Sequence, residues 1–182
     1  MRIIAGTHRG RRLVAPAGEA TRPTADRARQ ALFDMLLHAP WAGREALEGA
    51  RVLDAFAGSG ALGLEALSRG AAHAVFMDSA AQARAAIRAN ISTLAEGARS
   101  TVLPADATRP PRAPAPCGLV FLDPPYRAGL LPRALTALAA QGWFAPGALL
   151  CVEMARDDAP PEGEALADRT HGAARLIVLR TA

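Results

Sequence analysis

The fold is decided by the stretch Asp54-Ala55-Phe56-Ala57-Gly58-Ser59-Gly60-Ala61-Leu62-Gly63. The apolar pair before it predicts a strand, and residues 61–69 predict a helix. Its glycines match G-x-G-x-x-G, a pattern in which a tight turn brings backbone N–H groups close to a ligand. Asp78 follows Gly58 by 20 residues, where an acid can accept ribose hydroxyls. NAD, FAD and S-adenosylmethionine all contain an adenosine, so these residues do not choose among the three.

Strand and helix patterns alternate downstream of this loop. Strands are predicted at 74–77, 100–103, 119–122, 148–153 and 175–180, and helices up to about Leu94 and over 130–140. Such alternation predicts a parallel, doubly wound α/β sheet with helices on both faces. The proline-rich residues 109–116 are predicted not to be helical.

An acid follows or ends each of four predicted strands. These acids are Asp54, Asp78, Asp106 and Asp123. Each one alone is also a good helix cap. Because ligands of such sheets bind at the carboxyl ends of the strands, we expect the four to share one ligand site.

The positive charge of the chain is concentrated at its N-terminus. Residues 1–30 hold seven arginines and two acids, a balance of +5, whereas the rest holds 14 arginines and 15 acids, a balance of −1. Residues 2–5 and 11–15 predict a hairpin with a basic, glycine-flanked turn, and a helix is predicted over 25–38 with Thr24 as its N-cap. We expect a basic hairpin over 1–20 that meets nucleic-acid phosphates, and a catalytic domain over 21–182.

The remaining bulk features exclude several classes of protein. No apolar run approaches the roughly 18 residues that cross a bilayer, and Glu19 interrupts the stretch after Arg11-Arg12, so we expect no membrane span and no secretion signal. Cys117 and Cys151 lack metal-ligand spacing. They are predicted to be buried core residues of a cytoplasmic protein without a metal.

The turn Asp123-Pro124-Pro125-Tyr126 favours one ligand over the others. An exocyclic amine of a nucleobase is a poor nucleophile, because its lone pair is delocalised into the ring. The carboxylate of Asp123 and the carbonyl of Pro124 can each accept one N–H, which positions the nitrogen for methyl transfer. Pro125 fixes the turn, and Tyr126 offers a face on which an extruded base can stack. The alternative is a rigid polar turn without a function.

The same residues carry a resemblance to a known family. The glycine loop and Asp-Pro-Pro-Tyr resemble the amino-methyltransferases of nucleic acids. Four further segments resemble the RsmD family, over roughly residues 2–180: Arg2-Ile3-Ile4-Ala5-Gly6, Arg22-Pro23-Thr24-Ala25-Asp26-Arg27, Gly142-Trp143 and Val152-Glu153. That family methylates guanine N2 in bacterial small-subunit ribosomal RNA. The resemblance implies the class I methyltransferase fold, a mostly parallel seven-stranded doubly wound sheet, with a small N-terminal hairpin.

The resemblance also implies residue roles. S-adenosylmethionine would be held by Thr24, Asp54, Phe56, Ala57, Gly58, Ser59, Gly60, Asp78, Asp106 and Ala107. The target base would meet Asp123, Pro124, Pro125 and Tyr126, and RNA would meet Arg9, Arg11, Arg12 and Arg22. We expect a monomer that acts on ribosomal RNA or the small subunit. Two positions depart from the family pattern: Asp78 stands where glutamate is common, and Ala80 where a second acid is frequent.

Three other functions remain as alternatives. An N6-adenine methyltransferase of DNA or RNA would use the same turn, although a DNA enzyme normally needs a separate recognition domain. An NAD(P)-dependent oxidoreductase explains the glycines but leaves Asp-Pro-Pro-Tyr without a role. A third reading is a non-catalytic RNA-binding relative. Protein glutamine methylation is disfavoured by the basic N-terminus and by Asp123, where asparagine is usual.

Overall fold

A seven-stranded sheet forms the centre of the molecule in a computed structural model. The structure describes residues 1–16, 23–125 and 129–182, and for residues 23–25 and 171 it describes the backbone alone. The strands are β1 (Arg51–Ala55), β2 (His73–Met77), β3 (Ser100–Leu103), β4 (Cys117–Leu122), β5 (Phe144–Ala155), β6 (Ala165–His171) and β7 (Ala174–Arg180). Their order is β3-β2-β1-β4-β5-β7-β6. The pairs β5–β7 and β7–β6 are antiparallel, and the other neighbouring pairs of this sheet are parallel. The predicted mostly parallel, seven-stranded sheet is confirmed.

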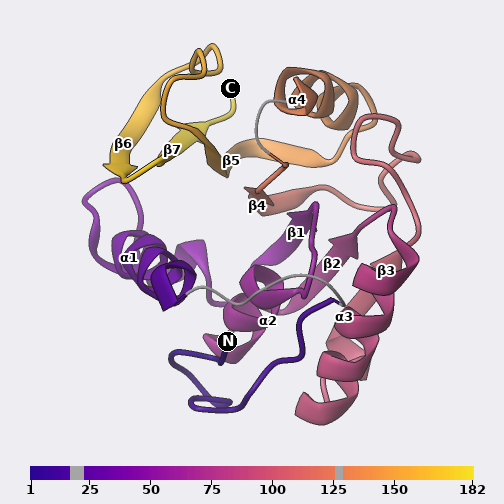
Figure 1. Cartoon of the computed structure of the whole chain (residues 1–182). Helices are drawn as coiled ribbons and strands as arrows, with labels where there is room; N and C mark the ends of the chain where they lie inside the picture. The colour runs from indigo at the N-terminus through magenta and orange to yellow at the C-terminus, as the bar shows by residue number, and fades with distance from the viewer. Residues whose placement is uncertain (17–22, 126–128) are drawn as a thin grey trace.

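Helices cover the two faces of the sheet unequally. On one face lie α1 (Pro23–His38), α2 (Ala61–Ser68) and α3 (Ala81–Leu94), and α4 (Leu130–Ala140) lies on the other (Figure 1). Side chains of β4 point alternately to the two faces of the sheet. Phe121 packs with residues of α1, α2 and α3, and Val120 packs with residues of α4. Two short 3-10 helices, Arg44–Ala46 and Gly97–Arg99, lead into β1 and β3.

The sequence located most of these elements but missed β6 and shortened β5. β6 is a polar edge strand, so it lacks the apolar run that identifies a buried strand. Its place is fixed by pairing with β7 and by Arg175, which donates to both carboxylate oxygens of Asp168 at 2.9 and 2.6 Å. The helix predicted over 25–38 begins at Pro23, so Thr24 lies within α1 and is not its N-cap.

The connection from β3 to β4 is not helical, as predicted for residues 109–116. Buried Trp143 holds it by donating its ring N–H to the carbonyl of Pro111 at 2.8 Å. The N–H of Ala113 is accepted by the carbonyl of Gln141 at 2.9 Å. The proline-rich segment therefore packs, through Ala113, against the part of the core that contains Trp143.

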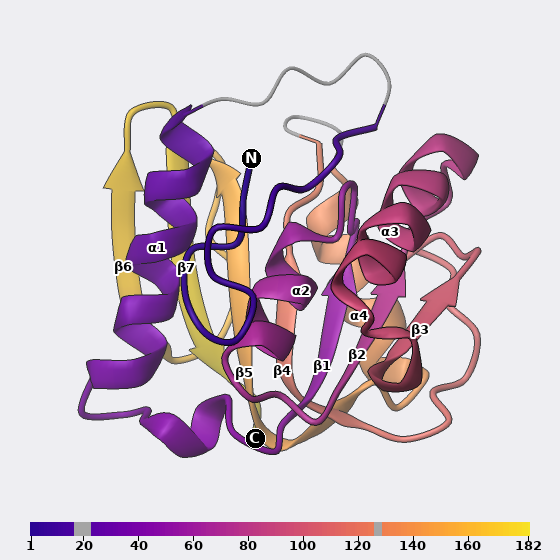
Figure 2. The same ribbon diagram turned by 90° about the horizontal axis from the view of Figure 1, so that it is seen from below.

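The N-terminal segment folds back on itself, but it is not the predicted pair of strands. Arg2 and Arg12 form a single antiparallel bridge. Backbone hydrogen bonds from Ile3 to Arg11 (2.9 Å) and from Leu13 to Met1 (3.1 Å) flank this bridge, so the segment is a short hairpin. On its other side, the carboxylate of Glu65 accepts the N–H groups of Ile4 and Ala5 at 2.8 and 3.0 Å. Residues 1–16, called the arm below, consequently lie along α2 and α3 (Figure 2).

Candidate active site

A cavity of about 980 Å³ opens at the carboxyl ends of the central strands. All four predicted acids line it, and so do six of the ten other residues predicted to meet the cofactor or the base: Phe56, Ala57, Gly58, Ser59, Pro124 and Pro125. Gly60 and Ala107 are buried behind this lining. The structure thus brings together four loops that are far apart in the chain.

The glycine loop takes its shape from two different requirements. Gly60 adopts a left-handed backbone with φ of 77° where α2 begins. A Cβ at Gly63 would lie 2.4 Å from the Phe76 ring, so only glycine lets α2 pack this closely on β2. Phe56 also has a positive φ, 61°, which is uncommon for a large side chain. Strain of this kind is usually found at ligand sites.

Asp78 fixes the first glycine of the loop. Its carboxylate accepts the N–H of Gly58 at 2.9 Å with one oxygen and the N–H of Ala80 at 2.8 Å with the other. A carboxylate has about four acceptor positions, so Asp78 can still accept two ribose hydroxyls. The acid therefore both holds the loop and faces the cavity.

Asp54 is the most perturbed acid of the site. It is 2% exposed, and its carboxylate accepts the N–H of Gly63 at 2.9 Å. Burial raises its pKa to about 8, and the charges of Asp123 and Asp78 add to the rise, against that hydrogen bond and the charge of Arg29. A cationic ligand in the cavity would relieve this repulsion.

Asp106 has the opposite environment. The backbone N–H and the hydroxyl of Thr108 both donate to it at 2.8 Å, and these hydrogen bonds lower its pKa, while Arg109 lies 3.5 Å away. Asp106 is half-buried, three residues beyond the end of β3. It is thus an anion that remains accessible at the cavity wall.

The Asp-Pro-Pro turn lies at the end of β4. Pro124 is buried, whereas Asp123 and Pro125 are exposed, and Tyr126 lies outside the described residues. Glu153 lines the same cavity from the neighbouring strand β5. The register of β4 and β5 pairs Leu122 with Val152. Asp123 and Glu153 are the residues that directly follow this pair, so they lie beside each other on the same face of the sheet.

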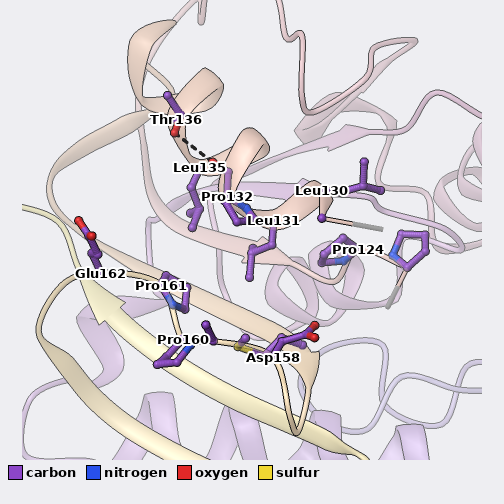
Figure 3. Close-up of a pocket in the computed structure, with 14 residues that line it drawn as sticks. Pro124, Leu130, Leu131, Pro132, Leu135, Thr136, Asp158, Pro160, Pro161 and Glu162 are labelled. Carbon is purple, nitrogen blue, oxygen red and sulfur yellow. Dashed lines mark hydrogen bonds between the residues drawn. The ribbon is translucent and has the colours of Figure 1, made fainter. Parts of the chain in front are cut away.

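A second hollow of about 610 Å³ adjoins the turn from the α4 side. It shares Pro124, Pro125 and Leu130 with the larger cavity. Figure 3 shows Leu131 and Leu135 of α4 on one side of it, with Pro160, Asp158 and Glu162 opposite. The Asp-Pro-Pro turn therefore stands between two cavities.

Sequence reasoning missed three residues that line the main cavity, namely Asp26, Arg29 and Glu153. Arg29 is 5% exposed and donates to the carbonyl of Arg2 at 2.5 Å and to Asp26 at 3.1 Å. In the sequence it counts only as one more basic residue of the N-terminus. Its spacing from Asp26 was the available signal, because residues three apart on a helix are neighbours.

The predicted RNA-binding residues that the structure describes do not line the cavity. Arg9, Arg11 and Arg12 are exposed on the arm. The turn that carries Arg9 is held at Ser68, because the N–H of Thr7 donates to the Ser68 carbonyl at 2.8 Å. Ser68 ends α2, about 10 Å along the helix from the glycine loop at the usual rise per residue. Arg22 and the Thr24 side chain lie outside the described part of the chain.

Both cysteines are buried, as predicted, and burial raises the pKa of the Cys117 thiol to about 11. Among the described residues no group of three or more histidine, cysteine or acidic side chains is placed to hold a metal ion. No described helix is both long enough and apolar enough to cross a membrane.

Comparisons with known proteins agree with this architecture. Residues 1–179 match the family model described as "Conserved hypothetical protein 95". The chain is 41% identical to ribosomal RNA small subunit methyltransferase D of Escherichia coli K12, over 84% of this chain and 74% of the relative. It is 37% identical to the putative rRNA methyltransferase YlbH of Bacillus subtilis, over 89% and 86%.

A solved structure, the putative methyltransferase yhhF from Escherichia coli, has the same fold. It superposes with a TM-score of 0.83 and 34% identity, over 100% of this chain and 97% of that one. Family match, sequence identity and superposition all span most of the molecule, and the family match includes the arm and the cavity loops. The chain belongs to the RsmD family, as its motifs predicted.

Proposed function

We propose that this protein transfers a methyl group from S-adenosylmethionine to the exocyclic N2 of a guanine in small-subunit ribosomal RNA. The observation that carries the proposal is the position of the Asp123-Pro124-Pro125 turn at the edge of a cavity lined by Asp54, Asp78 and the glycine loop. Membership of the RsmD family supports both the reaction and the substrate class.

The cavity fits the proposed cofactor in charge. S-adenosylmethionine carries a sulfonium and an ammonium, and the charges of Asp123 and Asp78 are close enough to Asp54 to raise the pKa of that buried acid further. Asp78 would accept the ribose hydroxyls and Asp106 the adenine amine, while Asp54 and residues 57–60 would surround the methionine half. The adenosine is therefore expected at the β2 and β3 end of the cavity, and the reacting end near β4.

The protein's part in the reaction is positioning. Bound S-adenosylmethionine supplies an electrophilic methyl group. Asp123 and the Pro124 carbonyl would each accept one N–H of the target amine, which orients its lone pair and favours the positive charge that develops on nitrogen. Tyr126 would stack on the extruded base. These roles need no metal and no nucleophilic side chain.

The substrate is expected to be RNA displayed by a folded particle. The arm is the basic part of the residues before β1, so its phosphate contacts would position the RNA, and the folded shape of the RNA would supply specificity. We expect a monomer acting in the cytoplasm on the small ribosomal subunit. Methylation of adenine N6 would use the same turn and is the competing outcome.

Mass spectrometry of ribosomal RNA nucleosides tests the proposal. Deleting the gene should remove one N2-methylguanosine, and the native chain, but not Asp123→Ala, should restore it. Cofactor affinity of Asp123→Ala should fall far less than turnover, because Asp54 and Asp78 still line the cavity whereas the acceptor for the target amine is lost. Loss of an N6-methyladenosine instead would move the proposal to adenine, and an unchanged nucleoside profile would refute it.

A further inference from the structure

The arm is held to the domain by buried polar side chains and not by its own arginines. Glu65, which is fully buried, accepts the N–H groups of Ile4 and Ala5. The hydroxyl of Ser68 donates to the carbonyl of Ala5 at 2.6 Å and accepts the N–H of His8 at 3.0 Å. Arg9, Arg11 and Arg12 are thus left exposed on a fixed backbone.

Asn90 forms the last of these attachments, at the cavity end of the arm. It lies on α3 and is 1% exposed. Its amide oxygen accepts the N–H of Val14 at 2.7 Å, and its amide nitrogen donates to the carbonyl of Val14 at 2.9 Å. One side chain thereby pairs with both polar groups of a single arm residue, as a neighbouring strand would.

The same amide nitrogen also reaches the glycine loop. It donates to the carbonyl of Ser59 at 2.9 Å. A second link joins the two segments directly, since the Ser59 hydroxyl lies 3.6 Å from the sulfur of Met1. Asn90, which is itself buried, therefore connects the arm with the loop that lines the cavity.

The arm also forms part of the cavity wall. Met1, Ala15 and Pro16 line the cavity together with Ser59. Val14 itself is 58% exposed, so its backbone pairing with Asn90, and not burial of its side chain, holds this stretch. Any ligand that fixes the arm will then also fix one wall of the cavity.

We propose that Asn90 is a positioning residue that couples RNA binding on the arm to cofactor binding at the glycine loop. The inference rests on the proposed function, because it takes the arm as the RNA contact and the cavity as the cofactor site. Binding of RNA phosphates to Arg11 and Arg12 stabilises the docked conformation of the arm. The hydrogen bonds of Asn90 then stabilise the glycine loop at Ser59 as well. Linkage then requires each ligand to raise the affinity for the other by the same factor.

Two variants interrupt the connection from opposite sides. Val14→Pro removes the N–H that Asn90 accepts, while the contact of Asn90 with Ser59 is left in place. Asn90→Asp keeps an acceptor for Val14 but loses both donated hydrogen bonds. Ser68→Ala is the matched control, since it loosens the far end of the arm without touching Val14 or Ser59.

The experiment measures the affinity for S-adenosylhomocysteine with and without small ribosomal subunits from an Escherichia coli strain that lacks its methyltransferase D. Subunits should tighten binding at least about fivefold in the native protein and in Ser68→Ala. The ratio should fall below about twofold in Val14→Pro and in Asn90→Asp, with thermal unfolding confirming that both are folded.

The possible results separate this inference from the proposed function. Native-like ratios in folded Val14→Pro, or an equal loss in Ser68→Ala, would overturn the role of Asn90. A native protein that methylates subunits but shows no tightening would overturn the coupling alone. A native protein that binds no S-adenosylhomocysteine would overturn the proposed function itself.

Discussion

The carboxylate of Asp78 accepts the backbone N–H of Gly58 at 2.9 Å, so the acid after β2 holds the glycine loop that follows β1. This hydrogen bond within the protein restrains the loop that lines the cavity. A preformed site loses less conformational freedom on binding, which favours affinity.

Asp78→Asn should weaken S-adenosylmethionine binding about 10- to 100-fold, since hydrogen bonds to a charged group contribute about 1.5–3 kcal/mol. The amide must also point a donor at the N–H of either Gly58 or Ala80. Calorimetry measures the change, and Asp34→Asn on exposed α1 surface controls for the lost charge. Equal affinities of the two variants would contradict the role of Asp78.

Asp54→Asn should make folding stability less dependent on pH. The pKa of Asp54 is raised from 3.8 to about 8, so in the native protein its favourable contribution is present below about pH 4 and is lost as the pH rises to about 8. Asparagine keeps an acceptor for Gly63 but cannot ionise. Urea unfolding measures the free energy of unfolding of both proteins. The difference, variant minus native, should rise between about pH 4 and pH 8 and stay constant above about pH 8.

Replacing Arg9, Arg11 and Arg12 by glutamine should weaken RNA binding and flatten its salt dependence. The slope of log affinity against log salt should fall by about 2 if all three meet phosphates of single-stranded RNA. The arm should stay docked, because its attachments use Glu65, Ser68 and Asn90. A matched triple of exposed arginines, Arg112, Arg133 and Arg156, removes the same charge elsewhere. Equal slopes in the two triples would exclude the arm as the contact.

Glu65→Leu should destabilise the protein by about 3–5 kcal/mol, because it leaves the buried Arg69 guanidinium without its carboxylate. It also leaves the arm N–H groups of Ile4 and Ala5 unpaired. Glu48→Leu breaks a pair of the same helical spacing with Arg44, but both side chains are exposed. That control should cost less than about 1 kcal/mol in denaturant unfolding. A small effect at Glu65 would mean that the arm is held by other contacts.

Local patterns were sufficient where each element carries its own signal. The strand before the glycine loop, the helix over 130–140 and the non-helical prolines of 109–116 were all located because apolar periodicity, glycine and proline act within a few residues. β6 was missed because a polar edge strand is stabilised by its pairing with β7. The N-terminal hairpin was located, but its pairing is shorter than predicted, and Glu65, 60 residues along the chain from Ala5, accepts the Ala5 N–H.

The sequence by itself determined the fold class, the family, the four acids of the cavity and the Asp-Pro-Pro turn. These depend on short motifs and on the order of strands and helices, which a chain expresses locally. Only the tertiary structure decided the raised pKa of Asp54, the place of Arg29 and Glu153 at the cavity, and the link from Val14 through Asn90 to Ser59. Burial and hydrogen bonds between distant segments exist only after packing, because they depend on which atoms exclude water from which others.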